Sequence, residues 1–259
     1  MRCERLLLAQ SGHDILRCEC PLMTDSGRGP VRHHLPLHPN LVCLPSVVEK
    51  AGDPVKLGFV GSLSRPGGNL TGVTQLGEEA TPKRLELLRE LLPTARVMAL
   101  LVNPAESLSE PQVRVSLAAA KTLGLELHVL NASIERDFDA AFEKLTALRA
   151  GGLTIGGSAF FTGHIEQLAA LTVRHRIPAI YQRREFAAAG GLMSYGTDIA
   201  ETHRLVGIYT GRVLKGEKPA DLPVQQAAKV ELYVNLKTAK ALGITVPISL
   251  LGRANEVIE

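Results

Sequence analysis

Polar and aromatic side chains follow four short apolar runs in the middle of the chain, at the points where those runs end. The residues are Asn103, Asn131, Ser158 with Phe160 and Phe161, and Tyr181 with Gln182. Amide and hydroxyl groups donate and accept hydrogen bonds, and an aromatic ring covers an apolar surface. This combination suits a small polar or zwitterionic ligand that has an apolar part.

Each of these residues also has a purely structural interpretation. Asn103 precedes Pro104, a pair that often starts a turn, and Ser158 is suited to cap the helix that follows it. Phe160 and Phe161 are large enough to belong to a core. The residue types alone therefore leave ligand contact and structural support both open.

The apolar runs resemble buried strands, and amphipathic helices separate them. We expect strands at 96–103, 125–130, 151–157 and 177–181, and helices at 81–93, 109–124, 133–148 and 162–175. Thr81 with Pro82, Ser109 and Ser133 are the expected helix starts. Such alternation predicts βαβ units, hence a parallel sheet with helices on both faces. Since the carboxyl ends of parallel strands share an edge, the candidate ligand-binding residues should lie along one edge.

Two glycine pairs interrupt this pattern. RPGGNLTG, at 65–72, precedes the first of these helices, and AAAGGLMSYG follows the last strand. After the second pair we expect a strand at 192–195, a long helix ending at Gly216, a strand at 229–235 and a short helix at 235–243. The chain thus enters one α/β body after a glycine-rich crossing and leaves it after another. Sequence from both ends should form a second body.

Several stretches in fixed order carry a family resemblance. They are RPGGNLTGV, KRLELLRELLP, IPAIYQRREFAAAGGLMSYG, KGEKPADLPV and NLKTAKALGITVP with the ending SLLGRANEVIE. Together they resemble ABC-transporter substrate-binding proteins of the type I periplasmic-binding fold, and more narrowly the branch associated with amino acids, aromatic ones among them. The resemblance covers about Gly52 to Glu259.

This resemblance implies two Rossmann-like α/β lobes with parallel sheets, joined by three crossing strands. A solute is held in the cleft between them and delivered to an ABC transporter permease in the membrane. Residues 81–191 would form lobe 2, and 51–80 with 192–259 a remnant of lobe 1, which is expected to be incomplete. Residues 1–50 do not resemble the family and would be an irregular segment. A non-functional or partner-dependent fragment of such a protein is the alternative interpretation.

The resemblance also suggests roles for particular residues. Three residues lie where the matched segment approaches the cleft of the family: Glu185, Tyr195 and Asp198. Asp198 could instead cap the helix that follows it, since Glu201 comes three residues later. Lobes of this kind close by bending at their crossings, which favours glycine there. The predicted hinge residues are Pro66, Gly67, Gly68, Gly190 and Gly191. Two ordinary loops with tight turns are the alternative.

The first 43 residues hold all four cysteines and no aromatic residue. Cys18, Cys20, His33 and His38 follow part of a zinc-finger spacing, but the cysteines are one residue too close and prolines interrupt the motif. We therefore expect no metal site and no disulfide framework. The family implies a periplasmic location, whereas no secretory signal is recognisable in these residues, which favours the cytoplasm if the chain starts as written.

Composition and missing motifs exclude other functions. The net charge of +3 and the absence of aromatic residues between basic ones argue against nucleic-acid binding, and no apolar run is long enough for a membrane span. Dinucleotide and phosphate-loop glycine motifs are missing, so no cofactor is expected. An enzyme would have to use Ser158 with His164 and an acid, without a G-x-S-x-G elbow. A sensory regulator of the same fold would need a helix-turn-helix, and none is recognisable. We predict a binding protein without catalytic residues.

Overall fold

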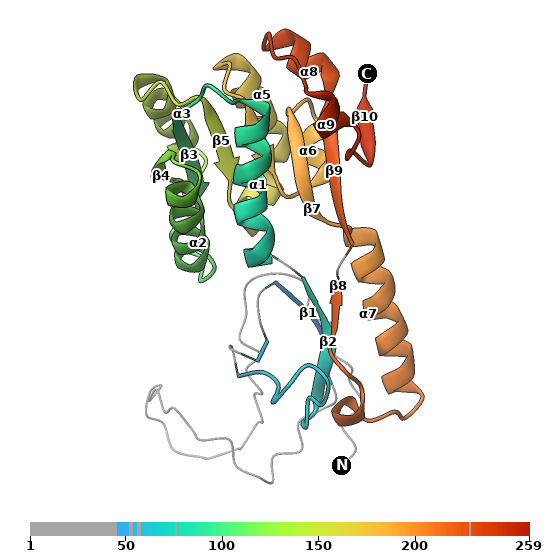
Figure 1. The fold of residues 1–259 in the computed structure, drawn as a ribbon. Coiled ribbons are helices and arrows are strands. Elements are labelled where there is room, and N and C mark those ends of the chain that lie inside the picture. The colour runs from blue at the N-terminus through green and yellow to red at the C-terminus, as the bar shows by residue number, and fades with distance from the viewer. Residues whose placement is uncertain (1–45, 52–53, 56–57, 76, 228) are drawn as a thin grey trace, which may run out of the picture.

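The computed structural model describes residues 46–51, 54–55, 58–75, 77–227 and 229–259, which form two sheets of different size (Figure 1). The larger sheet has the order β10-β9-β7-β6-β5-β3-β4. Its strands are β3 (Val97–Val102), β4 (Glu126–Asn131), β5 (Gly152–Ile155), β6 (Ala179–Tyr181), β7 (Met193–Thr197), β9 (Val230–Asn235) and β10 (Glu256–Ile258). The expected α/β class and the central parallel strands are confirmed, since β4, β3, β5, β6 and β7 all run parallel.

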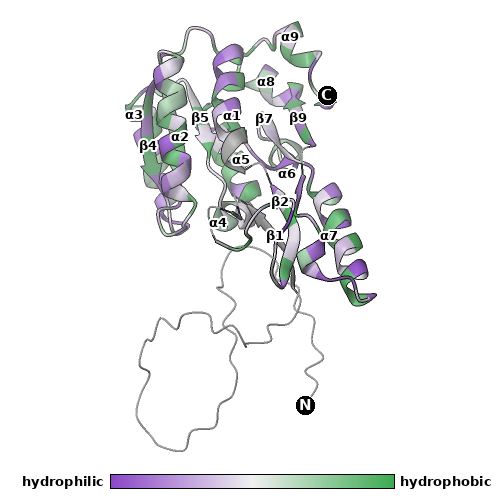
Figure 2. Ribbon diagram, turned by 60° about the horizontal axis from the view of Figure 1, so that its bottom comes forward, coloured by the Kyte–Doolittle hydropathy of each residue, from purple (hydrophilic) through white to green (hydrophobic). Residues whose placement is uncertain are grey.

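The smaller sheet has three parallel strands in the described part of the chain. They are β1 (Ser46–Ala51), β2 (Leu70–Gln75) and β8 (Gln225–Ala227), in the order β1-β2-β8. Helix α7 (Ile199–Leu214) packs beside them, and Tyr209, Val213 and Leu222 form a small apolar cluster there. Figure 2 shows hydrophobic and hydrophilic residues alternating along α7, as a helix with one packed face requires. Residues 46–50, expected to be irregular, belong to this sheet.

Helices cover both faces of the larger sheet because its strands are apolar on both sides. In β6, Ala179 and Tyr181 join one core cluster while Ile180 joins the other, following the two-residue period of a strand. The first cluster includes residues of α3 (Asp137–Ala147), α4 (Ala159–Gly163), α5 (Ile165–Arg174) and α6 (Arg184–Ala188). The second includes residues of α1 (Gly77–Leu91), α2 (Ser109–Thr122), α8 (Leu236–Ala241) and α9 (Ile248–Leu251).

The expected helices exist, but three of their starts differ. Helix α1 begins at Gly77 and contains Pro82, rather than starting there. The residue that precedes α2 is Leu108, so Ser109 is already helical. Helix α3 begins at Asp137, whose Oδ2 accepts from Ser133 N at 2.8 Å. Local side-chain signals therefore found these helices to within one turn. The last expected helix is interrupted at His164, which separates α4 from α5.

The assignment of 192–259 to the first lobe is wrong for most of that range. Strands β7, β9 and β10 lie in the larger sheet, with β9 antiparallel to β7 and parallel to β10. Only the segment from α7 to β8 lies with the smaller sheet. The physical reason is strand pairing: β7 continues the parallel sheet beside β6, and β9 then pairs along the whole length of β7.

Over residues 46–259, as far as they are described, the chain passes between the two sheets three times, the number that the resemblance implied. The passages lie between Gln75 and Gly77, at Asp198, and between Ala227 and Lys229. None of the predicted hinge residues lies at a passage.

Pro66, Gly67 and Gly68 precede β2 at its far end, where Gly61 N donates to Pro66 O at 3.1 Å and Gly67 has a φ of +75°. They form a tight turn.

The second glycine pair lies between α6 and β7. Gly190, with a φ of +99°, ends α6, and Gly191 N donates to Phe186 O at 2.8 Å. A Cβ on Gly191 would lie 2.3 Å from the Phe186 ring, so close packing explains this glycine. The hinge prediction failed because glycine pairs also serve helix ends and tight turns.

No helix in the described residues is long and apolar enough to cross a membrane. The zinc-like constellation of Cys18, Cys20, His33 and His38 lies outside the described residues, as does the segment 1–45 that contains it.

Candidate functional site

The carboxyl ends of β3, β4, β5 and β6 share one edge of the larger sheet, as the sequence predicted. In this parallel register Leu101 pairs with both Leu130 and Ile155, so Asn103 and Ser158 follow neighbouring strands at the same end. Both are buried, with exposed fractions of 7% and 5%. Asn131 lies at the same edge but is exposed. The edge therefore brings Asn103 and Ser158 together.

A carboxylate that the sequence analysis did not identify connects these two residues. Glu106 Oε1 accepts from Ser158 Oγ at 2.7 Å, from Asn103 Nδ2 at 3.2 Å and from Phe160 N at 3.4 Å. We call these four residues the Glu106 cluster. Asn103 Oδ1 also accepts from Ala105 N at 3.1 Å, the turn expected of an Asn-Pro pair. The donors of the predicted site are thus satisfied within the protein.

The aromatic residues at these strand ends differ in burial. Phe161 and Tyr181 are fully buried, and the Tyr181 hydroxyl lies 3.0 Å from Thr162 Oγ1 and donates to Ser158 O at 3.3 Å. Burial raises the pKa of Tyr181 to about 12. Phe160 is only partly buried and stacks on Phe138, with ring centroids 5.3 Å apart. Of the three aromatic residues predicted at these strand ends, Phe160 alone is not fully buried.

Ser158 acts as the helix cap that the structural interpretation proposed. Its Oγ accepts from Phe161 N at 3.3 Å while its hydroxyl donates to Glu106. His164 Nδ1 lies 2.8 Å from Phe160 O. Both side chains therefore have partners other than each other, and the arrangement offers no activated nucleophile. No group of His, Cys, Asp and Glu within the described residues is arranged to hold a metal ion.

A hollow of about 310 Å³, open to solvent, lies where the two sheets meet. We call it the junction pocket. It is lined by Gln75, Ala80, Arg84, Gln182, Arg183, Gly196, Thr197 and Ile199. Gln75 ends β2 of the smaller sheet, whereas Gln182 follows β6 and Gly196 lies in β7. The Gln182 side chain also lies close to Gly157, so the pocket adjoins the loop that carries Ser158.

Arg84 is the unusual group in this pocket. It lies on α1 and has an exposed fraction of 1%. Its Nη2 donates to Thr81 Oγ1 at 2.9 Å and its Nη1 to Tyr195 O at 3.4 Å, while Nε has no partner among the described residues. Burial lowers the pKa of Arg84 to about 10, since the charged form is disfavoured away from water. At neutral pH the guanidinium nevertheless remains charged.

The three residues taken from the family resemblance lie in different surroundings. Glu185 is exposed on α6, with its Oε2 3.5 Å from Arg183 Nε. Tyr195 is half-buried in β7 and packs on the cluster beneath α1. Asp198 caps α7, its Oδ1 accepting from Glu201 N at 3.1 Å, as the alternative interpretation had it. Among the described residues, no hydrogen bond or ion pair found for these three joins them to the Glu106 cluster.

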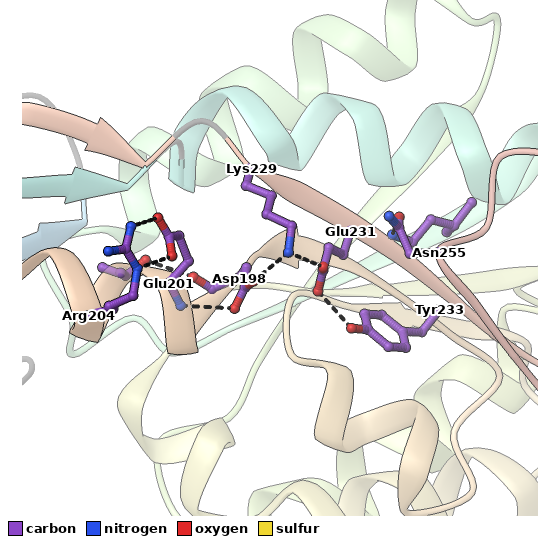
Figure 3. Close-up of polar contacts among 9 residues, drawn as sticks. Asp198, Glu201, Arg204, Lys229, Glu231, Tyr233 and Asn255 are labelled. Carbon is purple, nitrogen blue, oxygen red and sulfur yellow. Dashed lines mark hydrogen bonds and ion pairs between the residues drawn. The ribbon is translucent and has the colours of Figure 1, made fainter.

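Asp198 also belongs to an ion-pair network at the passages between the sheets (Figure 3). Lys229 Nζ lies 2.8 Å from both Asp198 Oδ2 and Glu231 Oε1, and Asp198 N donates to Lys229 O at 3.0 Å. Two of the three passages are thereby joined. The hydrogen bond from Lys229 holds the pKa of Asp198 below its usual value, and a bond from the same amine lowers the pKa of Glu231.

Sequence reasoning missed Glu106, Arg84 and Lys229. Arg84 carried a usable signal, because it lies four residues before Leu88 and seven before Leu91 and therefore on the apolar face of its helix. Glu106 and Lys229 lie in loop segments of the sequence, and neither belongs to a periodic pattern or motif that would mark it as a functional residue. Only the folded chain brings them to their partners.

The chain was compared with known families and structures. The family described as "ABC transporter substrate binding protein" matches residues 36–258, so the match begins before Gly52. A tyrosine-binding protein of Clostridioides difficile (strain R20291) is 26% identical over 199 residues, which cover 77% of this chain and 57% of that protein. This chain thus spans less than two thirds of that relative.

Two solved structures have a similar fold. The ABC domain from Streptococcus pneumonia in complex with L-Trp is 26% identical with a TM-score of 0.73, over 83% of this chain and 73% of that one. A conserved domain protein of Vibrio cholerae O1 biovar eltor is 25% identical with a TM-score of 0.74, over 82% and 71%.

The family match covers most of the chain, and the described residues have the α/β fold with parallel sheets seen in those structures. The family consists of binding proteins rather than enzymes, in agreement with the sequence analysis. The chain belongs to the ABC transporter substrate-binding protein family.

Proposed function

We propose that this protein is the solute-binding component of an ABC importer and that it holds an amino acid or a similar small molecule, an aromatic one in particular, between its two sheets. Membership of the family supports the general role. The choice of an aromatic amino acid is supported by two relatives, one described as tyrosine-binding and the other solved with L-Trp.

The observation that carries the proposal is the junction pocket beside the Glu106 cluster. The pocket takes its lining from both sheets, so a solute seated there would contact both bodies. Asn103, Ser158 and Phe160 lie at the adjoining strand ends, the usual place for ligands in parallel sheets. In this proposal Phe160 covers an apolar part of the solute, and the amide of Gln182 helps to orient it. Phe161 and Tyr181 support the site from the core.

The proposal assigns Glu106 a role before the solute arrives. Its carboxylate accepts hydrogen bonds from the side chains of Asn103 and Ser158, and these bonds hold both side chains in place at the strand ends. Side chains that are already held in place lose less conformational entropy when a solute binds beside them. The partner that receives the solute is an ABC transporter permease, and the place of action is outside the cytoplasmic membrane, both on the basis of family membership.

A thermal-shift screen with the twenty common amino acids tests this function. We expect an aromatic amino acid to raise the melting temperature, because a ligand that binds only the folded protein stabilises it. Isothermal titration calorimetry with the best amino acid then gives the stoichiometry, and glucose serves as the control solute. A cooperative melt that no amino acid shifts would reject amino-acid binding by this chain.

A further inference from the structure

A buried cation that has no anionic partner among the described side chains lines the junction pocket. Arg84 is almost completely inaccessible, yet both of its hydrogen-bond acceptors are neutral, namely Thr81 Oγ1 and the carbonyl oxygen of Tyr195. A buried guanidinium is costly unless a carboxylate or a similar anion neutralises it. Within the described part of the chain no carboxylate forms an ion pair with it. The charge is therefore uncompensated there.

Arg84 also retains unused hydrogen-bond donors. A guanidinium has five N–H donors, and the bonds to Thr81 and Tyr195 use two of them. The Nε donor is buried and has no partner among the described residues. The remaining donors belong to the planar group that best fits a carboxylate, since two parallel N–H bonds match its two oxygens.

The pocket in front of Arg84 is otherwise suited to an anion. Arg183, a second cation, lines the same hollow, and Glu185 Oε2 lies 3.5 Å from its Nε without hydrogen-bond geometry. Gln182 adds an amide. Among the residues whose side chains the structure describes, no Asp or Glu lines the pocket. The described lining therefore has excess positive charge, and the Arg84 part of it is almost inaccessible to water.

We propose that Arg84 binds the carboxylate, or an equivalent oxyanion, of the solute in the junction pocket. The inference rests on the proposed function and gives it a chemical requirement: the solute must be anionic at the end that enters this pocket. A bound anion would supply the charge partner that none of the described side chains provides. Because Arg84 lies on α1 and bonds to β7, the solute is thereby fixed to the larger body.

Three tyrosine-related probes and three variants test this inference. L-Tyrosine has both charged groups, 3-(4-hydroxyphenyl)propanoate has the carboxylate alone, and tyramine has the amine alone. Arg84→Met removes the charge but keeps an unbranched side chain, and Arg84→Lys keeps the charge without the planar fork. Arg96→Met removes an exposed arginine and is the control for the change in net charge. Binding is measured by calorimetry, and the ligand-free melting temperature is recorded for each variant.

We expect both carboxylate probes to bind the wild-type protein and the Arg96→Met control, and tyramine to bind neither. Arg84→Met should weaken carboxylate binding about tenfold to a hundredfold, the effect of losing a charge-assisted hydrogen bond, and Arg84→Lys should restore part of it. The ligand-free melting temperature of Arg84→Met should rise, because an unpaired buried charge is removed. A purely structural arginine would instead lower it.

Several results would overturn the inference. Equal binding of tyramine and L-tyrosine, or unchanged carboxylate binding by Arg84→Met, would show that Arg84 does not hold the anion. Binding of tyramine alone would reject the inference while leaving solute binding intact. Failure of every probe and every amino acid would reject the proposed function as well. A lower ligand-free melting temperature for Arg84→Met, with normal binding in Arg84→Lys, would make Arg84 a structural residue.

Discussion

Single residues in this protein are constrained most strongly where the backbone passes close to a neighbour. A Cβ on Gly196 would lie 2.0 Å from the carbonyl oxygen of Gln182, a distance that no side-chain movement relieves, since the neighbour is backbone. We expect Gly196→Ala to lower the free energy of unfolding by about 1–3 kcal/mol, the usual effect of overpacking, and to disturb the junction pocket. Urea denaturation followed by circular dichroism measures the change.

A matched control lies in the middle of α7. Gly207 is exposed and a Cβ there meets nothing within 4 Å. Gly207→Ala should stabilise the protein by about 0.5–1 kcal/mol, because alanine loses less backbone entropy in a helix. If the two substitutions had the same effect, close approach at Gly196 would not explain its glycine.

At the scale of elements, the start of α7 and the strand β9 are joined through Asp198 and Lys229. Asp198→Asn should keep the helix cap but lose the ion pair, whereas Asp198→Ala should lose both. We expect the alanine variant to be less stable than the asparagine variant by about 1 kcal/mol, the typical contribution of a helix cap. Urea denaturation at neutral pH distinguishes them.

The same contact has a defined pH dependence. The pKa of Asp198 is lower in the folded protein than its ordinary value of 3.8. Above pH 3.8 the ionised carboxylate therefore makes its full contribution to the stability of the folded protein. This contribution is lost as the pH falls through the lower pKa of the folded state. The difference in stability between wild type and Asp198→Asn should therefore shrink in acid. A difference that stays constant from pH 7 to about pH 3 would contradict the ion-pair explanation.

At the scale of the whole molecule, the two bodies have cores of very different size. Two large clusters cover the faces of the seven-stranded sheet, whereas Tyr209, Val213 and Leu222 make a small one beside α7. Hydrogen bonds such as Thr71 Oγ1 to Leu222 O at 2.7 Å supplement it. Since local stability follows the density of buried contacts, amide hydrogens of β2 and α7 should exchange faster than those of β3 and β5.

Hydrogen exchange followed by mass spectrometry checks this difference in peptides from each element. The four elements lie in one chain and one sample, so each serves as the reference for the others. Equal protection of all four would show that the protein opens as a single cooperative unit, and would remove the expectation that the smaller body moves independently.

Much of the larger body was predictable because the relevant signals are local. The two-residue period of the strands and the three- to four-residue stripe of the helices lie within short windows of sequence, and together they placed Asn103 and Ser158 at one edge. Helix starts were less accurate, since capping residues such as Ser109 have several possible positions within one turn. The glycine pairs misled the hinge prediction because their backbone freedom is used for turns.

The sequence by itself determined the α/β class, the alternation of strands and helices, the shared strand edge and the family resemblance, because all of these follow from short-range periodicity and from ordered motifs. Only the tertiary structure decided that β9 lies between β7 and β10 and antiparallel to β7, and that Glu106 accepts hydrogen bonds from Asn103 and Ser158. It also decided that Arg84 is buried with no anionic partner among the described residues. Sheet membership and desolvation depend on segments that are distant along the chain, and their partners are fixed only when those segments pack together.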